Sequence, residues 1–191
     1  PSHEIQLIKK IPNVNKVEGR VRTRVTFSHL DLRSTLVAGE AYSIALDGRS
    51  SLNGLHLISG RYPKAHSSEM VVLAQFAKAH GLHVGQSIQV VFPVGERSIK
   101  IVGTVYSPEQ VIVLSPDSAL FAPQEKYYGV IYLPITTLAD LSGLPNQYND
   151  IQVTTLNNAP KAVSVTMDKV SSKLSDYGVI YKELAKNKPS I

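Results

Sequence analysis

The 191-residue sequence lacks two residue types and has no long apolar run. Cysteine is absent, which excludes disulfide bridges, thiol catalysis and zinc sites built on thiolates. Tryptophan is also absent, so no indole can anchor a binding site. No stretch approaches the roughly 20 apolar residues that cross a bilayer, and no signal peptide is visible. The chain begins at Pro1, and we therefore expect a globular piece that is processed or cut from a longer protein.

The positive charge is unevenly distributed along the chain. The formal net charge is +5; residues 1–33 carry +4, residues 34–160 carry −2 and residues 161–191 carry +3. Because the two ends of a domain often lie close together, we expect residues 1–12 and 182–191 to lie side by side and to form one basic end. That end is either an ordinary solvated surface or a surface that faces an anionic partner such as lipid head groups.

A basic stripe accompanies the first apolar alternation. Arg20, Arg22 and Arg24 alternate with an apolar face made of Val17, Val21, Val25 and Phe27, which is typical of a half-buried strand with a basic outer face. Such a stripe fits a solvated sheet face, a contact with an anionic surface, or nucleic-acid phosphates. No aromatic residue shares this face to stack on a base, which disfavours nucleic acid.

Turn and periodicity signals predict the remaining elements. A helix is expected where isoleucines repeat before Pro12, another over residues 74–80, a third after Pro134, and a fourth from Asn158 to the stop at Gly178. Three glycines are expected to serve structure only: Gly81 as a helix end, Gly85 as a turn residue and Gly103 as a bulge or close approach. Strands are expected at 17–27, 35–46, 55–58, 70–73, 87–92, 98–106, 128–133, 150–156 and 179–181, with a hairpin turn at 93–96, a loop over 107–127 and a βαβ crossover at the C-terminus.

No local motif of catalysis is present. The sequence lacks a phosphate-binding P-loop, a dinucleotide-binding glycine motif, a nucleophile elbow and the H-E-x-x-H zinc motif. Two pairs of residues have the three-residue spacing of some metal ligands: His66 with Glu69, and His80 with His83. We expect their histidines to be surface or capping residues rather than metal ligands. We therefore expect no catalytic residue, no metal site and no cofactor. A hydrolase with dispersed catalytic residues stays open as a rival.

Several segments, taken in order, resemble those of FtsX-like ABC transporter permeases. The segment at 52–63, LNGLHLISGRYP, resembles the family pattern L-N-x-L-x-L-x-x-G-R-x-P, and the other segments lie before and after it in the family's order. Gln86 stands where the family more often has Asp. The remaining segments are VEGRV at 17–21, SEMVV at 68–72, FAKAHGLHVGQSI at 76–88, IVGTVYSPE at 101–109, YGVIYLP at 128–134, YNDI at 148–151 and YG at 177–178.

The resemblance implies a MacB-like extracytoplasmic core domain, which in this family is inserted between the first two transmembrane helices of the permease. Its implied fold is α+β and two-lobed. A mixed, membrane-proximal β/α lobe with βαβ units would span residues 1–48 and 128–191, and a smaller β-rich lobe would be inserted at 49–127.

The resemblance also implies a function and partners. The domain would be non-catalytic and extracytoplasmic, and would couple ATP-driven movement to transport, efflux or partner engagement. Its partners would be the permease's own transmembrane helices, a cytoplasmic ABC ATPase acting indirectly, and a membrane surface or second permease subunit, with no nucleic acid. The alternative is a basic module that binds nucleic acid or an anionic surface through Arg20, Arg22 and Arg24. The sequence names neither the substrate nor the direction of transport.

Overall fold

A computed structural model describes residues 2–28, 30, 36–45, 54–110 and 127–177. Helices and strands alternate irregularly along the chain, and the expected α+β class is confirmed. The order is α1 (Ser2–Lys9), β1 (Val14–Arg20), β2 (Arg22–Ser28), β3 (Val37–Ile44), β4 (His56–Gly60), β5 (Glu69–Leu73), α2 (Ala74–Ala79), β6 (Ser87–Phe92), β7 (Gly95–Tyr106), η1 (Pro108–Gln110), β8 (Tyr128–Pro134), α3 (Ile135–Leu141), β9 (Asp150–Thr155), α4 (Pro160–Lys173) and η2 (Ser175–Tyr177).

Six strands of the larger sheet close into a barrel. The order of this sheet is β4-β7-β5-β8-β3-β2-β6, and β6 also pairs with β7. Lys100 of β7 pairs with Glu69 of β5 on one edge and with Ser87 of β6 on the other, so the ring is complete. Closure satisfies the backbone groups that an open sheet would leave at its edges. Strand β4 adds to the second half of β7, outside the ring.

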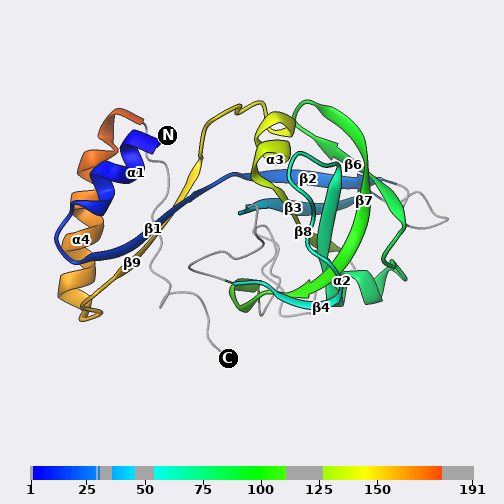
Figure 1. Cartoon of the computed structure of the whole chain (residues 1–191), viewed down its shortest axis with the longest axis horizontal. Helices are drawn as coiled ribbons and strands as arrows, with labels where there is room; N and C mark the ends of the chain where they lie inside the picture. Colours follow the sequence, from blue (N-terminus) through cyan, green and yellow to red (C-terminus); the bar gives the residue numbers. More distant parts are fainter. Residues whose placement is uncertain (1, 29, 31–35, 46–53, 111–126, 178–191) are drawn as a thin grey trace. The chain divides into compact units, whose positions relative to one another are not determined.

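Strands β3 and β8 form a parallel pair in the barrel (Figure 1). Every residue of β8 is buried. Gly39 and Gly129 face each other across this pair, and a Cβ on Gly129 would lie 2.4 Å from Phe27 and 2.7 Å from Phe76. The Phe27 and Phe76 rings, 5.0 Å apart, fill the space that the two glycines leave. Helix α3 packs against β3 and β8, and α2 packs against β5, β7 and β8.

The chain divides into two compact units. The terminal unit holds residues 1–17 and 153–191, and the barrel unit holds residues 18–152. These boundaries differ from the lobes expected at 1–48 plus 128–191 and at 49–127. The physical reason is strand pairing: β2 and β3 lie in the same closed ring as β5, β6, β7 and β8, so residues on both sides of position 48 share one core.

In the terminal unit α1 contacts α4, and Tyr177 donates a 2.6 Å hydrogen bond to Glu4. Val163 and Met167 of α4 are half-buried. The helix begins after Ala159 rather than at a side-chain cap from Asn158, because the Asn158 side chain accepts a hydrogen bond from Thr155 instead. The predicted stop, the strand at 179–181, the crossover it would complete, and residues 182–191 lie outside the described residues.

Local predictions in the barrel unit hold well. The hairpin of β6 and β7 pairs Phe92 with Gly95 across Pro93 and Val94, as the turn signal predicts. The first two barrel strands, β2 and β3, pair antiparallel. The single strand expected over 17–27 is interrupted at Val21, where β1 ends before β2 begins.

Candidate functional site: the Arg20 cluster

The interruption at Val21 is the point where the chain exchanges one strand partner for another. Before it, β1 pairs with β9; after it, β2 pairs with β3. The Asn149 side chain stabilises the backbone at this change of partner. It accepts a hydrogen bond from the Arg22 backbone N–H at 2.8 Å and donates one to the Arg22 carbonyl at 2.7 Å. The backbones of Val21 and Ser43 are joined by a 2.8 Å hydrogen bond on the other side. The backbones of Val21 and Arg22 therefore keep hydrogen-bond partners at the point where the two sheets separate.

Arg20 is clamped between two carboxylates at this point. Its guanidinium donates to both oxygens of Glu109 at 2.8 Å, and its Nε donates to Asp150. The side chains of Arg20 and Glu109 are only 12% and 8% exposed. Gln152 donates to Glu109 as well, at 3.3 Å. The bidentate geometry makes this a directional, charge-assisted contact rather than a loose surface ion pair.

The two carboxylates keep Arg20 charged. Burial acts to lower the pKa of Arg20, but the hydrogen bonds to Glu109 and the charge of Asp150 outweigh it and raise the pKa above its usual value. The cluster is therefore a permanent ion pair at any pH at which its carboxylates are ionised. A buried charge of this kind fixes geometry strongly, because removal of Arg20 would take away the cation that both carboxylates share.

A second ion pair continues the cluster across β3. Arg22 donates to Glu40 at 2.9 and 2.5 Å, and the Tyr42 hydroxyl donates to the same carboxylate at 2.5 Å. The Arg20 guanidinium lies 4.8 Å from the centre of the Tyr42 ring, and that ring stacks on Tyr132 at 5.7 Å. Burial first, and then the Glu40 charge, raise the pKa of Tyr42, which keeps its hydroxyl protonated.

Three of the segments that carry the family resemblance meet here. Arg20 comes from segment 17–21, Glu109 from 101–109 and Asp150 from 148–151. Tyr148 packs on Gly19 so closely that a Cβ on the glycine would lie 2.5 Å from its ring. Segments about 90 and 130 positions apart in sequence thus form one contact set. The sequence analysis quoted each segment but did not pair them, because ion pairs at such separations leave no periodic signal.

The structure places the three predicted anionic-contact arginines in different surroundings. Arg20 is largely buried in the cluster, Arg22 is ion-paired with 42% of its side chain exposed, and Arg24 is exposed. The stripe therefore does not present three free guanidinium groups, because the carboxylates of Glu40, Glu109 and Asp150 neutralise two of them. Contact of this stripe with an anionic surface stays a prediction. Of the three arginines, Arg24 is the one whose side chain is exposed and outside these ion pairs.

The predicted structural glycines lie at turns and at a close approach in the barrel unit. Gly81 follows α2 with φ of 62°, and Gly85 has φ of 99°. Gly103 sits in β7 opposite a register shift of β5, and a Cβ there would lie 2.6 Å from the Arg61 carbonyl oxygen. Within the described residues, no group of three or more His, Asp or Glu side chains could hold a metal ion. Among those residues no helix is long and apolar enough to span a bilayer.

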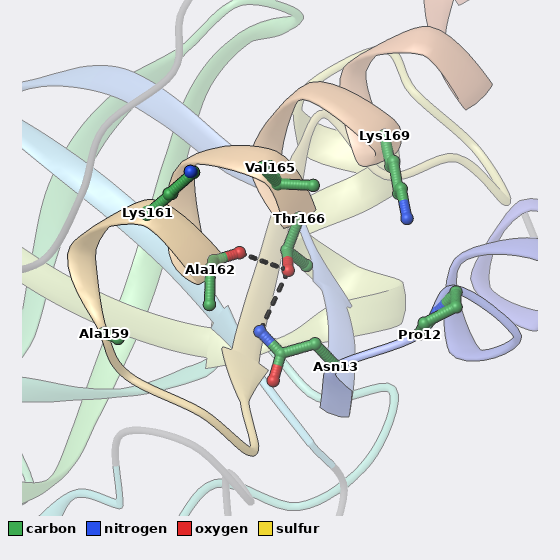
Figure 2. A pocket seen from close by; sticks show the side chains of 8 residues that line it. All are labelled: Pro12, Asn13, Ala159, Lys161, Ala162, Val165, Thr166 and Lys169. Atoms are coloured by element: carbon green, nitrogen blue, oxygen red, sulfur yellow. Dashed lines mark hydrogen bonds between the residues drawn. The ribbon is translucent and has the colours of Figure 1, made fainter.

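A second feature of interest is an open depression in the terminal unit, beside α4 (Figure 2). Asn13 builds its floor: its side chain donates to Thr166 at 3.0 Å and to the Asn157 carbonyl at 3.2 Å, and accepts from the Asn157 N–H at 2.7 Å. Thr166 in turn donates to the Ala162 carbonyl at 2.8 Å. The sequence analysis missed Asn13, whose only local signal is its place after Pro12 in a turn.

The fold of the chain is similar to that of a solved transporter domain. The extracellular domain of the noncanonic ABC-type transporter YknZ from Gram-positive bacteria matches with a TM-score of 0.54 and 14% identity, over 92% of this chain and 82% of that chain. The periplasmic region of MacB from Actinobacillus actinomycetemcomitans matches with a TM-score of 0.46 and 13% identity, over 90% of this chain and 72% of that one. The second likeness is the weaker, so the comparison of folds rests on YknZ.

No protein-family model and no curated protein matches the sequence. The α+β class that the permease resemblance implies is nevertheless the class found, and the solved domain of similar fold is the extracellular part of an ABC-type transporter.

Proposed function

We propose that this chain is the extracytoplasmic domain of an FtsX-like ABC permease and that it transmits movement rather than catalyses a reaction. The observation that carries the proposal is the likeness of fold to the YknZ extracellular domain over 92% of the chain. The convergence of three family-like segments on the Arg20 cluster supports it independently, because those segments were recognised from the sequence alone.

The connectivity of the two units suggests how movement would be transmitted. The chain passes between the units twice, once within β1 and once within β9, and these strands pair with each other. A displacement of the terminal unit, driven by a cytoplasmic ATPase through the permease's transmembrane helices, would pull on both strands together. The Arg20 cluster would carry that pull into the barrel, since it ties β1 to β9 and to η1.

Cysteine labelling of the parent protein tests the location. These 191 residues contain no cysteine, so Val94→Cys adds one thiol to them, at a site that is 45% exposed in the β6–β7 turn. Any cysteine elsewhere in the parent protein is first replaced by serine. A membrane-impermeant maleimide should then label the Val94→Cys thiol in intact cells. The matched control is Met70→Cys, which is fully buried and should react only after denaturation. Labelling of Val94→Cys only after the cells are permeabilised would overturn the proposal.

A further inference from the structure

The depression beside α4 combines an apolar surface with a basic rim. Its volume is about 430 Å³, and Pro12 and Val165 contribute to its walls while Lys161 and Lys169 flank it (Figure 2). Lys161, Val165 and Lys169 are four residues apart, so they follow one side of the helix. Val165 is 46% exposed, and both lysines are exposed.

The whole terminal unit shares this basic character. It carries nine lysines, no arginine and four acidic residues, whereas the barrel unit carries eleven residues of each sign. The entire net charge of the protein therefore belongs to the terminal unit. Each of its lysines within the described residues is exposed, at positions 9, 10, 16, 161, 169 and 173.

We propose that this depression and its flanking lysines bind the surface of a membrane containing anionic phospholipids. The inference rests on the proposed function, which puts the domain next to a membrane. Lysine ammonium groups are point charges on flexible apolar stems, and they attract lipid phosphates while their stems cover apolar surface. The exposed Val165 and Pro12 between them offer a small apolar area to the acyl boundary of the interface.

The composition of the depression favours a lipid surface over a protein partner. Protein interfaces obtain most of their binding energy from Trp, Tyr and Arg anchors in closed pockets, and lysine is depleted in them. The lining of this depression contains no aromatic residue and no arginine. Its charges are exclusively lysine, which suits a fluid anionic surface without fixed partner positions.

Vesicle sedimentation with the 191-residue chain tests the proposal. We expect binding to phosphatidylcholine vesicles that contain about 30% phosphatidylglycerol, and little binding to phosphatidylcholine alone. Raising the salt from about 50 mM to about 500 mM should weaken the binding to anionic vesicles.

The double variant Lys161→Glu/Lys169→Glu should bind these vesicles at least about tenfold more weakly than the unmodified chain. The matched control, Lys78→Glu/Lys100→Glu, changes the net charge equally on exposed lysines of the barrel unit and should keep the binding. Circular dichroism verifies that both variants fold.

Three results would overturn the proposal. Equal weakening by the two double variants would mean that only net charge matters. Absence of binding to anionic vesicles, or equal binding to neutral ones, would exclude the charged lipid site. Capture of a purified acidic protein that depends on Lys161 and Lys169, without vesicle binding, would make the depression a protein-docking site. The proposed function is judged separately by the Val94→Cys labelling, so a failed vesicle assay with extracytoplasmic labelling refutes this inference alone.

Discussion

At the scale of single residues, the ion pair of Arg61 with Glu69 determines part of the response to acid. Arg61 donates to both Glu69 oxygens, at 2.8 and 2.6 Å, and the Lys64 N–H adds a third bond at 3.0 Å. The hydrogen bonds from Arg61 are the main cause that lowers the pKa of Glu69 from its ordinary value of 4.5 to about 2. The pair therefore stabilises the fold fully above about pH 4.5, and this contribution is lost as the pH falls toward 2.

We predict that Glu69→Gln lowers the stability at neutral pH and flattens its dependence on pH between 4.5 and 2. Denaturant midpoints measured across this window check the expectation. Arg61→Gln is the matched control, because it leaves the carboxyl in place and should raise the pKa of Glu69 toward its ordinary value, which NMR titration reports directly. An unchanged Glu69 titration in Arg61→Gln would contradict the assignment.

Residue-level partners were the part of the structure that the sequence predicted least. The sequence analysis considered Glu69 beside His66, three positions away, whereas its partner is Arg61 across the turn before β5. Arg20 was placed on an outer stripe by alternation, yet it is held inward by Glu109 and Asp150. Alternation predicts which face of a strand a side chain takes, but it carries no information about a carboxylate that arrives from a distant segment.

At the scale of elements, Asn13 joins the start of β1 to the start of α4. It has φ of 74°, a left-handed conformation that asparagine tolerates better than most residues. Its side chain forms hydrogen bonds with the backbone N–H and the backbone carbonyl of Asn157, and a third one with the Thr166 hydroxyl. Its own carbonyl accepts from the Leu156 N–H at 2.9 Å. The turn after α1 and the loop before α4 are thereby held by one residue.

We predict that Asn13→Ala destabilises the fold by about 2–3 kcal/mol, of which about 1 kcal/mol is backbone strain and the rest lost hydrogen bonds. Asn146→Ala is the matched control, since Asn146 is exposed with φ of 57° and should show only the strain. Asn13→Gly removes the side-chain hydrogen bonds, but glycine adopts a positive φ without strain. Its destabilisation should therefore lie between those of Asn13→Ala and Asn146→Ala. Equal destabilisation by Asn13→Ala and Asn146→Ala in urea denaturation would show that the Asn13 side-chain bonds contribute nothing.

Elements fixed by local signals were predictable, and those fixed by distant pairing were not. Pro93, Val94 and Gly95 make the turn of the β6–β7 hairpin, and Gly81 ends the helix before it, because both depend on neighbouring residues only. The break at Val21 depends on Asn149, which arrives from the far end of the chain. The closure of the barrel likewise depends on β7 pairing along both edges, which no periodicity in the sequence reveals.

At the scale of the whole molecule, charge and chain connectivity divide the protein in the same place. The terminal unit is basic and the barrel unit is neutral, and the boundary between them falls within β1 and β9. The lobe boundaries at 48 and 127 that the family resemblance implies differ from this division, because β2 and β3 pair within the barrel. The Arg20 cluster lies on the barrel side of the boundary, at the root of both crossing strands.

This position leads to a prediction about cooperativity. Arg20→Met keeps an apolar stem against Tyr42 but removes the guanidinium that pairs with Glu109 and Asp150, which should cost about 3 kcal/mol in the free energy of unfolding. The chain passes between the two units within β1 and within β9. Weaker contacts where these strands enter the barrel unit should therefore increase amide hydrogen exchange more in the terminal unit than in the barrel unit.

Arg24→Met is the control, because Arg24 is an exposed arginine on the neighbouring strand, and it should change stability by less than about 0.5 kcal/mol. Glu109→Gln should act in the same direction as Arg20→Met and non-additively with it, since both remove the Arg20–Glu109 ion pair. Hydrogen exchange that rises uniformly over both units in Arg20→Met would mean that the cluster stabilises the fold without coupling its parts.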